Sequence, residues 1–137
     1  MKLHFVDTET TSLDPNSGEI TEIAIITIDT ELKTKSIFCK KIKIENYAAA
    51  NPKSLEIGNY NEEVWDKEAV LFSEIADQVE EILKTGWFVA HNVYFDHSFI
   101  KNQMEKYDKK ITYKKFDTVC LVHEYLMPTL KSTSMNA

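Results

Sequence analysis

The chain has 137 residues, of which 43% are hydrophobic and 28% charged, so it can form a hydrophobic core and is not intrinsically disordered. No apolar run approaches the roughly 20 residues of a membrane span, and no signal-peptide pattern follows Met1 and Lys2. The net charge of −6 does not exclude nucleic acid, because divalent metal partly cancels the charge of an acidic site. We expect one domain, residues 1–137, in the cytoplasm and without a membrane partner.

The N-terminal part of the sequence predicts three strands. Residues 2–7 predict the first strand, and a turn-forming cluster, residues 14–19, follows it. Residues 20–29 are rich in β-branched residues, which is typical of a core strand. Residues 36–44 alternate apolar residues with lysines, which predicts a strand antiparallel to the second one. Its lysines indicate an edge position, because charge at a sheet edge discourages aggregation.

The remaining sequence alternates helices and strands. Residues 47–61 predict irregular structure, and residues 62–69 one or two helical turns. Apolar residues at three- and four-residue steps predict a helix at 73–84, with Ser73 as its N-cap and Gly86 at the C′ position. We expect the last elements to be a buried strand at 87–90, a helix at 95–106, a strand at 113–116 and a helix at 118–126. This order indicates the α/β class with a mixed five-stranded sheet flanked by helices.

The cysteine and arginine content limits the kinds of bond and nucleic-acid contact that the chain can form. Cys39 and Cys120 lie far apart in apolar stretches, which predicts free buried thiols. Residues 1–100 carry a net charge of −9 and residues 101–137 a net charge of +3. The chain contains no Arg, so the common bidentate contact with guanine cannot form. A nucleic acid would therefore be bound through its backbone and ends, although an AT-rich genome explains the missing Arg equally well.

Two carboxylates follow the first predicted strand, in the stretch from Asp7 to Thr11. Asp7 and Glu9 are two residues apart, and side chains along a strand alternate between faces, so both project from the same face. Crowded carboxylates repel each other unless a cation lies between them. The pair therefore predicts a metal site, whereas alone it also fits a polar strand end with a Thr-rich turn.

A third carboxylate follows the buried strand at 87–90. Asp96 falls in the first turn of the next helix, where the helix dipole favours a negative charge. This position fits a helix cap as well as a metal ligand. Asn92 fits a left-handed turn, Phe95 fits the core, and His91 fits a structural histidine.

Taken together, these stretches resemble a known family. The sequences F-V-D-T-E-T-T-S-L at 5–13 and V-A-H-N-V-Y-F-D-H-S-F-I at 89–100 are similar to the first two motifs of the DEDD superfamily of 3′→5′ exonucleases. The closest likeness is to the DnaQ-like branch, which includes the proofreading subunit of bacterial DNA polymerase III. Phe116-Asp117-Thr118 matches the D-T strand end of that branch. The resemblance covers essentially the whole chain and implies a ribonuclease H-like fold.

The resemblance also implies a function and a set of site residues. Such enzymes hydrolyse the 3′-terminal phosphodiester bond of single-stranded DNA or RNA with two Mg²⁺ or Mn²⁺ ions and release nucleoside monophosphates. By the same resemblance, the catalytic, metal-binding residues would be Asp7, Glu9 and Asp96. The residues that bind the terminal nucleotide would be Thr8, Thr10, Thr11, Leu13, Asn92 and Phe95.

One part of the family pattern is missing. The family carries a fourth carboxylate and a general base, His or Tyr, on a late helix. After Asp117 the acidic, basic and histidine side chains of this sequence are His123, Glu124 and Lys131, and the first two belong to the predicted helix at 118–126. We therefore expect a C-terminally truncated exonuclease domain. Three alternatives remain: an active enzyme, a module that binds nucleic-acid ends or a protein partner without turnover, and a domain that another chain completes, as in a homo-oligomer.

Overall fold

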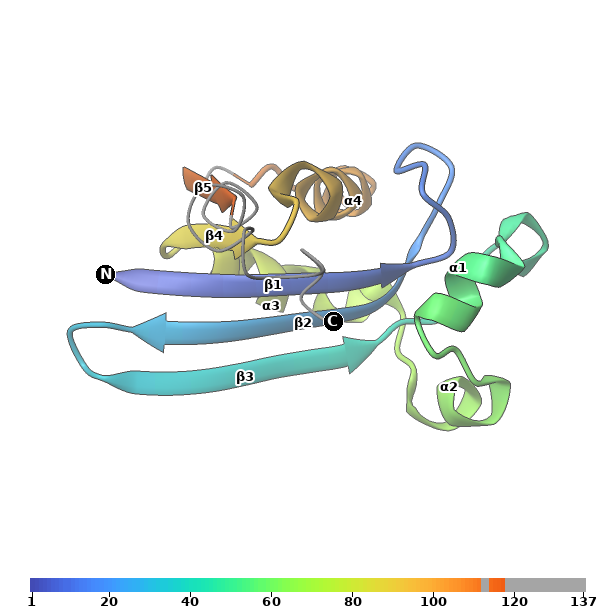
Figure 1. The fold of residues 1–137 in the computed structure, drawn as a ribbon, viewed down its shortest axis with the longest axis horizontal. Helices are drawn as coiled ribbons and strands as arrows, with labels where there is room; N and C mark the ends of the chain where they lie inside the picture. Colours follow the sequence, from blue (N-terminus) through green and yellow to red (C-terminus); the bar gives the residue numbers. More distant parts are fainter. Residues whose placement is uncertain (112–113, 118–137) are drawn as a thin grey trace, which may run out of the picture.

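The computed structural model describes residues 1–111 and 114–117, which form a mixed five-stranded sheet with helices around it (Figure 1). The strand order is β3-β2-β1-β4-β5. β1 pairs antiparallel with β2 and parallel with β4, β2 pairs antiparallel with β3, and β4 pairs parallel with β5. This arrangement confirms the predicted α/β class and mixed sheet. The strands are β1 (Lys2–Thr10), β2 (Ile20–Asp29), β3 (Thr34–Lys41), β4 (Trp87–Ala90) and β5 (Lys114–Asp117).

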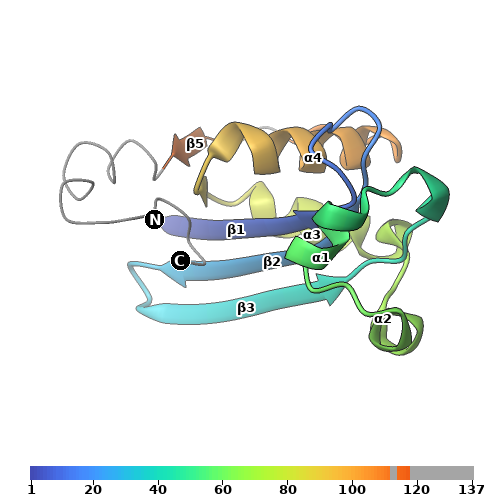
Figure 2. The ribbon, with the colours of Figure 1, turned by 45° about the vertical axis from the view of Figure 1, so that its right-hand side comes forward.

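Figure 2 shows α1 and α2 beside the end of the sheet where β1 and β3 finish. The helices are η1 (Tyr47–Ala49), α1 (Pro52–Ile57), α2 (Glu62–Glu68), α3 (Phe72–Leu83) and α4 (Val93–Glu105). Among the described residues, no helix combines the length and the apolar composition that crossing a membrane requires. The helix predicted at 118–126 lies outside the described residues.

Three sequence predictions about helices were wrong, one about the presence of a helix and two about helix ends. The stretch predicted as irregular contains α1, which starts at Pro52 and is capped by the Asn51 side chain accepting a hydrogen bond from the N–H of Lys53. Helix α3 begins before Ser73, because the Glu74 carboxylate accepts a hydrogen bond from the N–H of Leu71. Gly86 is not a left-handed C′ residue: its φ is not positive, and a Cβ there would collide with the carbonyl oxygen of Lys2.

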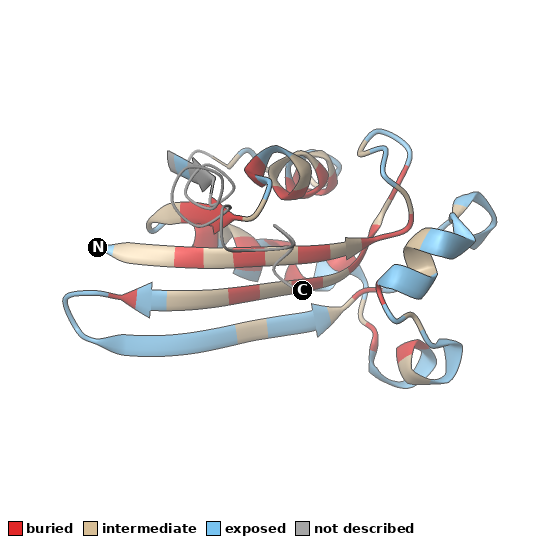
Figure 3. Cartoon of the chain, in the orientation of Figure 1, coloured by how far each residue is buried: buried red, intermediate tan, exposed pale blue. Residues whose placement is uncertain are grey.

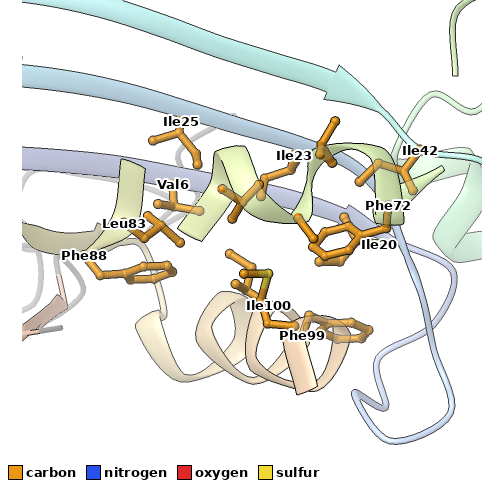
Figure 4. Close-up of a cluster of buried hydrophobic side chains, with 14 of the residues drawn as sticks. Val6, Ile20, Ile23, Ile25, Ile42, Phe72, Leu83, Phe88, Phe99 and Ile100 are labelled. Carbon is orange, nitrogen blue, oxygen red and sulfur yellow. The ribbon is translucent and has the colours of Figure 1, made fainter. Parts of the chain in front are cut away.

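One face of the sheet packs on α3 and α4 and forms the core. Burial alternates along β1: His4, Val6, Thr8 and Thr10 are buried, whereas the residues between them are half-buried (Figure 3). Val6 meets Ile25 of β2, Leu83 of α3 and Ile100 of α4 in this core (Figure 4). Because alternate residues of β1 point to opposite faces, the same packing places Asp7 and Glu9 on the face away from the core.

Strand β3 is the exposed edge of the sheet, as its lysines predicted. Cys39 lies on this strand and is exposed, so the prediction of a buried thiol there was wrong, although the thiol is free. The reason is that β3 has no packed layer over it: every one of its residues is exposed except Phe38 and Lys41, which are half-buried. Cys120 lies outside the described residues.

Candidate active site

Asp7 and Glu9 lie on one face near the end of β1, as the sequence predicted. In the register with β2, Asp7 is opposite Ala24 and Glu9 is opposite Glu22. The register shifts between Glu9 and Thr10, and such bulges redirect side chains near functional sites. Like charges directly opposite each other on neighbouring strands are destabilising, so the Glu9–Glu22 pair destabilises this end of the sheet.

Glu22 is a carboxylate that the sequence analysis did not find. Its Oε2 atom lies 3.7 Å from the Nζ atom of Lys41, which in turn lies 3.4 Å from Oε2 of Glu68. Lys41 therefore balances part of the charge beside Glu9. The hairpin register alone would have revealed Glu22, but the connection between β1 and β2 is too long for the sequence to fix that register.

Asp96 is fixed to β1 by two hydrogen bonds. The pairing of β1 with β4 covers only Leu3 to Phe5, so β1 continues beyond its neighbour. Past that point the N–H of Thr8 donates to Oδ1 of Asp96 at 3.0 Å, and the Thr8 hydroxyl donates to the same oxygen at 2.6 Å. Asp96 is only 4% exposed. The carboxylate thus replaces the missing strand partner and is held one residue away from Asp7 along β1.

The electrostatics of the three carboxylates follow from this crowding. Burial raises the pKa of Glu9 to about 7, and the charges of Asp7, Glu22 and Asp96 act in the same direction. Burial also raises the pKa of Asp96 to about 7, against the hydrogen bonds from Thr8 and with the charge of Asp7. The pKa of Asp7 is raised by burial as well, although nearby His91 lowers it. The protein therefore holds three acids where burial and mutual repulsion outweigh the hydrogen bonds and the positive charge that favour their ionised forms.

These carboxylates fit a hard divalent cation that keeps part of its water shell. Among the described residues, no group of three or more His, Cys, Asp and Glu side chains has a geometry that could hold a metal ion. Mg²⁺ does not require such a cage, because it usually retains several waters and binds one or two carboxylates together with substrate phosphates. The all-oxygen donor set favours this mode of binding over a soft-metal site.

The residues predicted to bind the terminal nucleotide fall into two groups. Thr8, Thr10 and Thr11 are buried, with Thr8 bound to Asp96 and the Thr10 hydroxyl donating to the carbonyl of Ser12 at 2.7 Å. Leu13 and Asn92 are exposed in the loops that follow β1 and β4. For Thr8 the structure shows a role in positioning Asp96, and its contact with substrate stays a prediction.

The remaining predicted contacts lie on α4 and in the loop after β1. Asn92 has a left-handed backbone (φ 65°) before the first turn of α4, which confirms the predicted turn. Phe95 is half-buried and packs against Phe99, with ring centroids 5.0 Å apart. Thr11 exchanges two hydrogen bonds with the backbone of Glu19, which closes the loop between β1 and β2.

Helix α1 packs directly on the site. A Cβ atom on Gly58, which caps α1, would lie 3.1 Å from Cβ and 3.2 Å from Oε2 of Glu9. The absence of a side chain at Gly58 therefore allows the helix end to confine Glu9. No sequence pattern predicts this contact, because it depends on where α1 docks and not on local conformation.

Comparison with known proteins shows which family the chain belongs to. A family model described as Exonuclease (RNase_T) matches residues 5–136. The chain belongs to this exonuclease family. That membership confirms the resemblance inferred from the two sequence motifs.

Two curated relatives of this chain are each described as 3′-5′ exonuclease DinG. The protein from Bacillus subtilis is 32% identical over 102 residues, which cover 74% of this chain and 10% of the relative. The protein from Staphylococcus epidermidis is 34% identical over 70 residues, which cover 51% of this chain and 8% of the relative. The chain thus spans a tenth or less of the relatives' length.

Solved structures support the fold. An exonuclease I structure without ligand superposes with a TM-score of 0.78 at 15% identity and covers 93% of this chain and 32% of that one. E. coli exonuclease I in complex with a dA16 oligonucleotide gives a TM-score of 0.76 at 14% identity, covering 88% and 29%. The exonuclease domain described here therefore has the ribonuclease H-like fold that the resemblance implied.

Proposed function

We propose that this chain is a metal-dependent 3′→5′ exonuclease domain that releases nucleoside monophosphates from the 3′ end of single-stranded nucleic acid. The observation that carries the proposal is the convergence of Asp7 and Glu9 on β1 with Asp96 on α4, held by Thr8. Because the chain belongs to the exonuclease family, we interpret these three carboxylates as a site for phosphodiester hydrolysis. Exonuclease I, which shares the fold, is known in complex with a single-stranded oligonucleotide and with SSB, which supports a nucleic-acid partner.

The three carboxylates would hold two Mg²⁺ or Mn²⁺ ions. When bound, such ions activate water and stabilise charge on the attacking and leaving oxygens of a phosphodiester. Asp7 would contact both ions, Glu9 would hold one and orient the terminal nucleotide, and Asp96 would hold the other. Because their pKa values are raised, a cation must displace protons from these carboxylates, so metal binding should be coupled to proton release. A zinc-bound form of exonuclease I with single-stranded DNA supports a divalent cation at this fold.

Incubation of the chain with a 5′-labelled single strand tests the proposal. With Mg²⁺ or Mn²⁺ we expect stepwise shortening from the 3′ end, and none after removal of the metal with EDTA. Parallel DNA and RNA strands of one sequence show which sugar is accepted. Retention of full length under every metal condition contradicts exonuclease activity, and binding without shortening identifies an end-binding module instead.

Replacing Thr8 with Val removes the hydroxyl that donates to Asp96 but keeps a similar shape. We expect hydrolysis to fall by about tenfold, because hydrogen bonds to charged groups contribute about 1.5–3 kcal/mol and this one fixes the Asp96 carboxylate. The measurement is the initial rate of shortening at saturating metal. Thr8→Ser, which keeps the hydroxyl, is the matched control and should keep most of the rate, and a Thr8→Val variant as active as the parent would show that this hydrogen bond does not matter for hydrolysis.

Replacing Gly58 with Ala inserts a methyl group against Glu9. We expect the rate at limiting Mg²⁺ to fall by about 3- to 10-fold, because displacing a catalytic group by a fraction of an ångström weakens its alignment. The backbone of Gly58 suits alanine (φ −80°), so thermal unfolding should change little. Glu56→Ala changes an exposed side chain of the same helix and should leave the rate unchanged.

A further inference from the structure

The outer side of α4 carries an exposed aromatic ring beside a lysine of the neighbouring strand. Tyr94 is 69% exposed and lies two residues before Asp96, in the first turn of α4. The Nζ atom of Lys115, on β5, lies 5.7 Å from the centre of the Tyr94 ring. Because Asp96 is buried and Tyr94 exposed, the two side chains of this turn face different environments, one inside the site and one outside it.

Positive charge gathers around this ring. Lys101 follows Tyr94 by seven residues on α4, which places it two turns further along the same side of the helix, and Lys115 lies over the ring itself. Lys101 is exposed and reaches Glu105 only at 4.0 Å, an exposed i,i+4 pair that holds it weakly. In the sequence, residues 101–137 have a net charge of +3, against −9 for residues 1–100. The edge of the molecule at α4 and β5 (Figure 2) thus offers basic side chains on a chain that is otherwise acidic.

We propose that Tyr94, Lys101 and Lys115 form a second contact for single-stranded nucleic acid, 5′ of the terminal nucleotide. A base stacks on the ring of Tyr94, and the two ammonium groups contact adjacent phosphates. Non-specific single-strand binding combines these two elements: aromatic faces for bases and cations along the backbone. Lys115 is exposed, and a lysine ammonium group is carried on a four-carbon stem with rotatable bonds, so it can move from the ring to a phosphate when a base takes its place. The inference rests on the proposed function, since that function fixes the strand's 3′ end at Asp7 and Asp96.

Binding without hydrolysis tests this contact independently of catalysis. The probe is a 5′-fluorescent oligothymidylate of about 12 nucleotides, within the span of single-strand sites, measured by anisotropy in EDTA at several salt concentrations. We expect Tyr94→Ala to weaken binding about tenfold with an unchanged salt slope, and Tyr94→Phe to bind like the parent. Lys115→Gln should lower the slope of log affinity against log salt by about 0.7, the value for one phosphate contact on a single strand.

The controls make every outcome decisive. Lys33→Gln removes an exposed lysine between β2 and β3, at the other edge of the sheet, and should leave affinity and slope unchanged. If Tyr94→Ala binds like the parent, if Lys33→Gln lowers the slope as much as Lys115→Gln, or if the parent does not bind, the proposal is wrong. Lys101→Gln replaces any variant that thermal melting shows to be unfolded. If the parent protein binds the strand in a way that depends on Tyr94 but does not hydrolyse it, the exonuclease proposal is contradicted and the proposal of this contact is still supported.

Discussion

We expect the Asp7→Asn variant to lose 3′-terminal hydrolysis by at least about 10³-fold while the protein stays folded. Asp7 shares one face of β1 with Glu9, and Asp96 is hydrogen-bonded to the next residue, Thr8, so we propose that Asp7 contacts both ions. Metal ions contribute several kcal/mol of charge stabilisation to phosphodiester cleavage, and each 1.4 kcal/mol is a factor of about ten in rate. Asn has nearly the same shape but no charge, so the change removes metal binding rather than packing.

The rate of shortening of a 5′-labelled strand measures this effect, and thermal unfolding in EDTA checks the fold. Because burial raises the pKa of Asp7, its neutral replacement should unfold at the same or a higher temperature above pH 7. Asp66→Asn, which changes an exposed aspartate on α2, is the matched control and should keep parental activity. Equal activity of the Asp7 variant and the parent would show that the cleavage comes from a contaminant or from another site.

The second large effect concerns pH: we expect activity to rise with pH and the stability of the metal-free protein to fall. Glu9 and Asp96 both have a pKa of about 7, and both must lose a proton to bind a cation. At limiting Mg²⁺ we therefore expect hydrolysis to fall by at least about tenfold between about pH 8 and pH 6. Glu9→Gln should flatten this profile at a low rate, since one of the two titrating groups is gone.

The stability of the metal-free protein should decrease as pH rises, whereas activity increases. An acid whose pKa is raised in the folded state stabilises the fold at low pH, and this stabilisation is lost as pH rises from about 4, its value in the unfolded chain, to about 7. In EDTA we expect the unfolding temperature to decrease through this window. Mg²⁺ should raise it again, most strongly above pH 7.

Melting curves at several pH values, with Mg²⁺ and with EDTA, measure both effects. In EDTA near pH 8, Glu9→Gln should be more stable than the parent by about 1 kcal/mol after allowance for solvent screening, or about 3 °C. A parent whose melting temperature in EDTA rises steadily from about pH 4 to pH 7 would show that these carboxylates are compensated in the folded state. Glu63→Gln, on the exposed side of α2, should leave the profile unchanged.

Several features of the site were predictable because they depend on short-range geometry. The two-residue spacing of Asp7 and Glu9 places them on one face of any strand, and the structure has them there. The position of Asp96 in the first turn of a helix follows from the apolar strand before it and the turn at Asn92. The edge position of β3 follows from its lysines, although the exposure of Cys39 did not.

Other features depend on contacts between distant segments. The hydrogen bonds from Thr8 to Asp96 can form because β1 extends beyond the residues that pair with β4. How far one strand extends past its neighbour is not a local property of its sequence. Glu22 reaches Glu9 through the register of β2, and Gly58 reaches it through the docking of α1. Neither contact has a signature in the residues around it.

The sequence by itself thus determined the fold class, the family motifs and the three carboxylates, because periodicity and spacing dictate which side chains share a face. Only the tertiary structure decided how those carboxylates are held and how their pKa values shift. Burial and charge repulsion depend on which atoms surround a group in space, and those atoms come from β2, α1 and α4 together. The pair Asp7 and Glu9 was visible in the sequence, and its electrostatic environment arose only when the chain folded.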